Sequence, residues 1–179
     1  AASMTMQGTD WKESISRPSQ AMSTLAMALG FWVILLTLVN IAIGAYSPGF
    51  KVMWIGFISG DSAASNVVHD GAGLVLDDVV FALLGVVLLT LGSIGMKRIF
   101  DGGVMEWFRG LPSGPVATSL MSSENGIRRT MASWLIVFGV IFYLSWSSLN
   151  TTWVDPGVYA VMVILVSFGF GIHTLEDAS

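Results

Sequence analysis

The segment Val79–Met96, VVFALLGVVLLTLGSIGM, decides what kind of fold this chain can adopt. It has 18 consecutive residues without a charge, which make about 27 Å of α-helix at about 1.5 Å per residue. That length is close to the hydrocarbon thickness of a bilayer, about 30 Å. Asp77 and Asp78 precede the segment, and Lys97 and Arg98 follow it, an order of charges that the helix dipole favours. The segment therefore predicts a transmembrane helix.

Three further apolar stretches complete the pattern. With the first they predict four membrane spans, at about 21–45, 79–96, 130–149 and 156–175. The chain is 54% hydrophobic and 11% charged, whereas about 25% of the residues in an average soluble domain are charged. We therefore expect an all-α membrane protein whose four transmembrane helices form an antiparallel bundle, as a single integral membrane domain over residues 1–179. Two connecting segments, at about 51–76 and 102–110, are expected at the membrane interface.

The positive residues predict how the spans are oriented. Lys12 and Arg17 precede the first span, and five more basic residues lie between the second and third spans. Lys51 alone lies between the first and second spans, and no Lys or Arg lies between the third and fourth. Because cytoplasmic loops carry the excess of Lys and Arg, we expect both termini on the cytoplasmic or equivalent side. The expected location is a plasma (inner) membrane or an organellar energy-transducing membrane.

Composition and motifs exclude several classes of protein. The formal net charge of -4 argues against a nucleic-acid partner, because phosphate binding needs a basic face. The chain has no cysteine, which excludes disulfides, thiolate-ligated iron–sulfur clusters, covalently attached c-type haem and thiol catalysis. No nucleophile elbow, P-loop, GxGxxG or zinc signature is present. The sequence therefore lacks the parts of a stand-alone enzyme.

An acidic group gathers on the side of the membrane opposite the termini. Its members are Asp61, His69, Asp70, Asp77, Asp78 and Asp155. Carboxylates and an imidazole there can bind a divalent cation, with Asp70, Asp77 and Asp78 as candidate ligands, or pass protons at the membrane surface. The spacing matches no EF-hand, and Asp77 and Asp78 would project about 100° apart on a helix. We favour the interpretation that these are solvated loop residues.

The two histidines are the candidate nitrogen ligands for a cofactor. His69 is expected on the outer side and His173 near the inner end of the fourth span, so that about 30 Å of membrane separates them. At that separation they cannot hold one haem or one metal together unless the segment 62–78 enters the membrane, although either could share a haem or a quinone with another subunit. The favoured interpretation is that each histidine forms local hydrogen bonds at an interface.

Small and polar residues form a stripe along the first span. The stripe consists of Ala26, Gly30, Thr37, Asn40 and Gly44, which lie within about 80° of one another on a helix. Small residues let helix backbones approach closely in lipid, and the amide and hydroxyl groups can hydrogen-bond between helices. A transport path would also need a polar stripe, but no charge lies deep in any span. The stripe is therefore interpreted as a helix-packing surface.

Taken together, these features predict a non-catalytic integral membrane subunit that anchors or stabilises a larger respiratory or other redox complex. Its expected partners are other integral membrane subunits and the lipid bilayer. A small oligomeric transporter or channel, and a quinone- or haem-bearing membrane anchor, are the alternatives. In size and four-span layout the chain is similar to several small membrane subunits, including that of thiosulfate:quinone oxidoreductases. No motif matches residue by residue, so this layout is an analogy and assigns no family.

Overall fold

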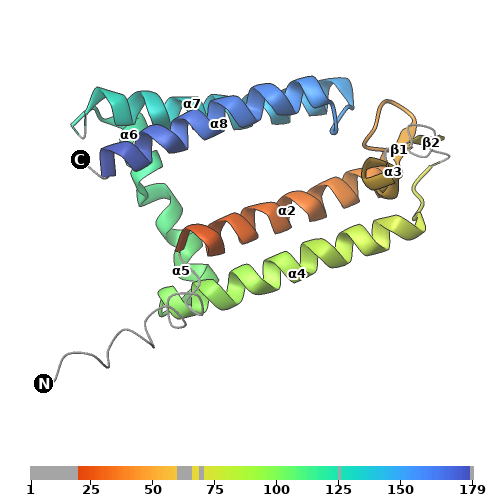
Figure 1. The fold of residues 1–179 in the computed structure, drawn as a ribbon, viewed down its shortest axis with the longest axis horizontal. Coiled ribbons are helices and arrows are strands. Elements are labelled where there is room, and N and C mark those ends of the chain that lie inside the picture. Colours follow the sequence, from red (N-terminus) through yellow and green to blue (C-terminus); the bar gives the residue numbers. More distant parts are fainter. Residues whose placement is uncertain (1–19, 60–65, 69–70, 125, 178–179) are drawn as a thin grey trace, which may run out of the picture.

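A computed structural model describes residues 20–59, 66–68, 71–124 and 126–177 of the chain. Within these residues, four helices are long and apolar enough to cross a membrane, and they lie at the positions of the four predicted spans. They are α2 (Gln20–Ala42), α4 (Leu76–Ile99), α7 (Ile127–Asn150) and α8 (Pro156–Asp177). Figure 1 shows them as two helical hairpins, with α4 returning beside α2 and α8 returning beside α7.

Glycines let α2 and α4 pack closely. A Cβ atom added to Gly30 would lie 2.8 Å from the backbone nitrogen of Leu89, and one added to Gly92 would lie 2.9 Å from that of Met27. Both distances are too short for a real side chain, so the two backbones approach as only glycine allows. The small residues of the first hairpin therefore set how closely its two helices approach.

The second hairpin uses the same device. A Cβ atom on Gly169 of α8 would lie 2.6 Å from the carbonyl oxygen of Ala132 on α7. The turn between the helices is short: Thr151 takes a left-handed conformation (φ 52°) that ends α7. Asp155 then accepts a hydrogen bond from the backbone nitrogen of Val158 at 3.0 Å, which caps the start of α8.

The two ends of the molecule are built differently. At one end, hereafter the α5 end, the chain passes from one hairpin to the other (Figure 1) through α5 (Gly103–Gly110), the 3₁₀ helix η2 (Leu111–Ser113) and α6 (Pro115–Met121). At the other, the ribbon end, β1 (Phe50–Val52) pairs antiparallel with β2 (Asn66–Val68), and α3 (Trp54–Ser59) lies between them in sequence. The segments expected at about 51–76 and 102–110 thus contain these short elements.

The hydrophobic core that joins the hairpins lies at the ribbon end. Its buried members are Leu36 of α2, Ala45 in the turn after α2, Val52 of β1, Trp54 of α3, Tyr143 of α7, Trp153 and Val154 in the turn between α7 and α8, and Val158 of α8. Among the described residues, α2 packs lengthwise on α4 and α7 packs lengthwise on α8. The fold is therefore two hairpins fastened at one end and linked by short helices at the other.

Several helix boundaries differ from those expected from hydropathy: α4 runs on to Ile99 and α7 begins at Ile127, and two further differences lie at the ribbon end. The first span was expected to reach Ala45, but α2 ends at Ala42 because Gly44 takes a positive φ of 82° and turns the chain. The second was expected to begin at Val79, but α4 begins at Leu76. Asp77 and Asp78 therefore belong to the first helical turn, a place where carboxylates are favoured by the helix dipole.

Candidate functional site

Asn40 lies near the end of α2 and is completely buried. Its amide nitrogen donates to the carbonyl oxygen of Val52 at 3.0 Å and to Asp78 Oδ1 at 2.8 Å. Its amide oxygen accepts from the backbone nitrogens of Ala45 at 3.1 Å and Val52 at 2.7 Å. An amide side chain offers two N–H donors and two acceptor lone pairs, so all four positions are used. One side chain thereby ties α2, β1 and α4 together.

Asp78, on α4, is the second member of this network and is also completely buried. Its Oδ1 accepts from Asn40 and from the indole nitrogen of Trp54 at 2.7 Å, and its Oδ2 accepts from the backbone nitrogen of Val75 at 3.1 Å. The Trp54 ring is held in place by stacking on Phe81, with centroids 3.9 Å apart. We call Asn40, Trp54 and Asp78 the polar cluster.

The polar cluster corrects the interpretation of Asp78 as a solvated loop residue. Its side chain is completely buried, and its hydrogen-bond donors, Asn40, Trp54 and the backbone of Val75, are all neutral groups that satisfy its oxygens. A buried polar group is costly only when it lacks such partners, so the network makes the burial possible. The arrangement joins α2, α3 and α4 at one point, so the role of the polar cluster is structural.

The candidate metal ligands do not converge in the part of the chain that the structure describes. Asp77 has a different partner from Asp78: its Oδ2 accepts from the backbone nitrogen of Ile55 at 3.3 Å. Among the described residues no three His, Asp or Glu side chains lie close enough together to hold a metal ion. Asp70 and His69 lie outside the described residues. A metal site at Asp70, Asp77 and Asp78 stays a prediction.

Lys51, the one basic residue between the first two spans, is almost fully buried. Its ammonium group donates to the carbonyl oxygen of Gly73, and the backbone nitrogen of Gly73 donates to the carbonyl oxygen of Ile41 at 3.2 Å. The lysine therefore ties the returning loop to β1, while the backbone of Gly73 ties the same loop to the end of α2. Sequence reasoning missed this role, although a single lysine inside the apolar run FKVMWIGF was a signal for it.

An aromatic junction of Trp32, Tyr143, Trp153 and Tyr159 connects the two hairpins. The Trp32 ring lies 4.4 Å from that of Tyr143, which stacks on Tyr159 at 5.3 Å. The Tyr143 hydroxyl donates to the carbonyl oxygen of Trp153 at 2.5 Å. The backbone nitrogen of Trp153 donates to the carbonyl oxygen of Ala45, in the first hairpin, at 2.9 Å. This junction depends on residues far apart in sequence, and sequence reasoning did not identify it.

His173 lies between α7 and α8 at the α5 end and is largely buried. Its Nε2 is 2.9 Å from the hydroxyl oxygen of Ser133, which is completely buried. Nearby, Arg128 and Glu176 form an exposed ion pair of 3.5 Å between the same two helices. One ring nitrogen of His173 thus serves a local contact between helices. A cofactor held by His69 or His173 stays a prediction.

The residues of the small-and-polar stripe do different things. Gly30 faces α4, and Ala26 is half-buried. Thr37 donates to the carbonyl oxygen of Val33 at 2.8 Å within α2, rather than to another helix. Asn40 makes the contacts between segments described above. Gly44 lies beyond the helix, where its positive φ lets the chain turn toward β1.

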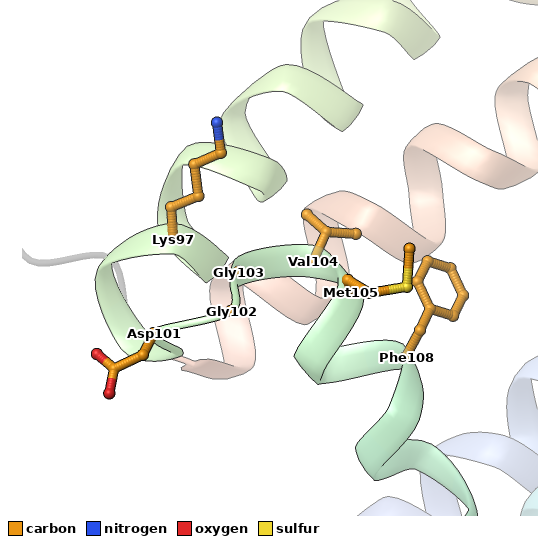
Figure 2. A pocket seen from close by; sticks show the side chains of 7 residues that line it. All are labelled: Lys97, Asp101, Gly102, Gly103, Val104, Met105 and Phe108. Carbon is orange, nitrogen blue, oxygen red and sulfur yellow. The ribbon is translucent and has the colours of Figure 1, made fainter.

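An open pocket lies at the α5 end, where the last turn of α4 meets α5 (Figure 2). Lys97 and Asp101 line it from the α4 side and the turn. Val104, Met105 and Phe108 line it from α5. The Phe108 ring lies 5.8 Å from that of Phe31, edge to face, which holds α5 against α2. This pocket combines a cation, an anion and apolar side chains.

No protein-family model, curated protein or solved structure matches this chain.

Proposed function

We propose that this chain is a non-catalytic integral membrane subunit that anchors or stabilises a larger membrane complex. In the proposed arrangement its four spans cross the bilayer in alternating directions, with both termini on the cytoplasmic or equivalent side, as the distribution of Lys and Arg favours. A respiratory or other redox complex is the proposed class of assembly. The partners are then other integral membrane subunits, with lipid covering the remaining surface.

The way the spans pack supports this proposal most strongly. Among the described residues each long helix packs lengthwise against one other helix. Within an apolar stretch of 18 residues in each span, 33% of the residues are buried in α2 and only 17% are buried in α8. Large apolar side chains such as Leu83 on α4 and Phe168 on α8 are exposed. In a membrane these faces meet lipid or other helices, so the two hairpins offer wide surfaces for neighbouring subunits.

The use of the polar groups supports a structural role as well. The amide of Asn40 and the carboxylate of Asp78 bond to each other and to the backbone, and Lys51 bonds to a backbone carbonyl. Ser133 and His173 bond to one another. A substrate or ion path would need such groups to face a shared channel. Here these polar groups instead form hydrogen bonds that join segments of the chain to one another.

Photo-crosslinking in the native membrane tests the proposal. A photoreactive amino acid is placed at Leu83 or Phe168, and the crosslinked products are identified by mass spectrometry after purification in mild detergent. We expect crosslinks to a different integral membrane protein from at least one of these positions. Crosslinks only between copies of this chain would favour the oligomeric transporter or channel. Crosslinks only to lipid would exclude a neighbouring subunit at these faces and contradict the proposal.

A further inference from the structure

The pocket at the α5 end lies at the level where a membrane span ends. Lys97 occupies the last turn of α4, which ends at Ile99, and α5 begins only four residues later at Gly103. α5 is a short amphipathic helix: Met105 and Phe108 are apolar and exposed, whereas Glu106 and Arg109 are charged. A helix of this kind at the end of a span lies in the headgroup region, with its apolar side chains toward the acyl chains. The pocket is therefore accessible to lipid.

Two opposite charges line this pocket at different heights. Figure 2 shows Lys97 directed back along α4 and Asp101 on the opposite side of the turn, directed away from the span. Lys97 and Asp101 are both exposed, and no ion pair between them is found among the described residues. Met105 and Phe108 lie beside each other on the α5 side of the pocket. The order from the span outward is cation, then anion, next to an apolar wall.

A phospholipid with a primary amine carries the complementary order of groups. Its acyl chains are followed by a phosphate and then, farther from the hydrocarbon, by an ammonium group. We propose that this pocket binds phosphatidylethanolamine, with the phosphate at Lys97, the ammonium group at Asp101 and an acyl chain against Met105 and Phe108. The ammonium group donates N–H bonds that a carboxylate accepts, and both pairs are charge-assisted. A choline headgroup has no N–H, and phosphatidylglycerol has no cation to pair with Asp101.

Native mass spectrometry of the purified full-length chain, with any subunits that accompany it, tests this assignment. Phosphatidylethanolamine, phosphatidylcholine and phosphatidylglycerol with identical acyl chains are titrated separately, and apparent affinities are compared. We expect the ethanolamine lipid to bind most tightly. Lys97→Gln and Asp101→Asn should each lower its affinity about two- to fivefold, as expected for exposed ion pairs. Asp101→Asn should also remove the preference for ethanolamine over choline, because only the amine contacts this carboxylate.

Matched controls separate the pocket from general surface charge. Arg109→Gln removes a cation from α5, and Glu124→Gln removes an exposed carboxylate from the segment before α7; neither residue lines the pocket. Both variants should bind phosphatidylethanolamine as the unchanged protein does. Stepwise N-methylation of the headgroup gives a readout without mutation, and affinity should fall as N–H groups are lost. Equal binding of the three lipids, tighter binding of phosphatidylglycerol, or equal losses in the control variants would overturn the assignment.

Discussion

Asn40 Nδ2 lies 2.8 Å from Asp78 Oδ1, and both side chains are completely buried. The bond joins the last turns of α2 to the first turn of α4, across a separation of 38 residues. Trp54 reaches the same carboxylate from α3 at 2.7 Å. Because each polar atom in this cluster needs the others, the loop between the first two spans is held by a network that loses several bonds when one member is removed.

Replacing Asn40 by leucine should lower the free energy of unfolding by about 2–3 kcal/mol, because the buried backbone nitrogens of Ala45 and Val52 lose their acceptor. Thr37→Val is the matched control, since Thr37 is also buried in α2 but bonds within its own helix. The control should cost about 0.6 kcal/mol or less. Unfolding in mixed micelles with increasing SDS measures both. If both substitutions lowered the free energy of unfolding equally, Asn40 would contribute no more to stability than a buried residue that bonds within its own helix.

Asp78→Asn should also destabilise the protein, by about 1–3 kcal/mol, because the new NH₂ group meets donors where the carboxylate accepted them. The site supplies N–H groups from Asn40, Trp54 and Val75. A double-mutant cycle with Trp54→Phe should give a coupling energy of about 1 kcal/mol or more. The same unfolding assay measures each variant. Additive effects of the two substitutions would contradict the bond between Trp54 and Asp78.

Two glycines in α8, two residues apart, should respond oppositely to alanine. At Gly169 the added Cβ would lie 2.6 Å from the carbonyl oxygen of Ala132, so the helices must separate and stability should fall by about 1–3 kcal/mol. At Gly171 no atom lies within 4 Å of the added Cβ. There alanine should leave stability unchanged or raise it by up to about 1 kcal/mol, through its higher helix propensity. A loss at Gly171 as large as that at Gly169 would refute the described packing of α7 on α8.

Tyr143→Phe should loosen the connection between the hairpins. The substitution removes the 2.5 Å bond from the Tyr143 hydroxyl to the carbonyl oxygen of Trp153, at an expected cost of about 1–2 kcal/mol. Because the backbone nitrogen of Trp153 donates to Ala45 of the first hairpin, amide hydrogen exchange at Trp153 should become faster. Tyr46→Phe, at an exposed tyrosine, is the control and should change neither quantity. Unchanged exchange at Trp153 in Tyr143→Phe would contradict this role.

The sequence located the spans well because the requirement for a span is local. About 20 apolar residues in a row meet it, whatever lies beside them. The ends were less predictable, since α2 stops three residues early at a turn that depends on the φ of Gly44. The start of α4 differs for a related reason: both oxygens of the Asp78 carboxylate accept hydrogen bonds from backbone and side-chain donors, so the helix can include this residue.

For the candidate site, too, the sequence indicated single residues but not their partners. The stripe on the first span marked Asn40 as unusual, because an amide in a span is costly without partners. Its partners were not evident, since Val52 and Asp78 lie 12 and 38 residues away. Trp54 lies in the segment expected at the membrane interface, and only the folded chain places its indole nitrogen within hydrogen-bonding distance of the Asp78 carboxylate. Lys51 read as a loop cation, yet it is buried against a carbonyl.

By itself the sequence determined that the chain has four segments long and apolar enough to cross a membrane, and which charges flank them, because these follow from the length and polarity of continuous segments. Only the tertiary structure decided which helices pair, that the hairpins join at the ribbon end, and that Asp78 is a buried partner of Asn40. In lipid, apolar helices have little hydrophobic preference for one another. Glycine contacts and a few satisfied polar groups make the choice, and these depend on residues distant in the chain.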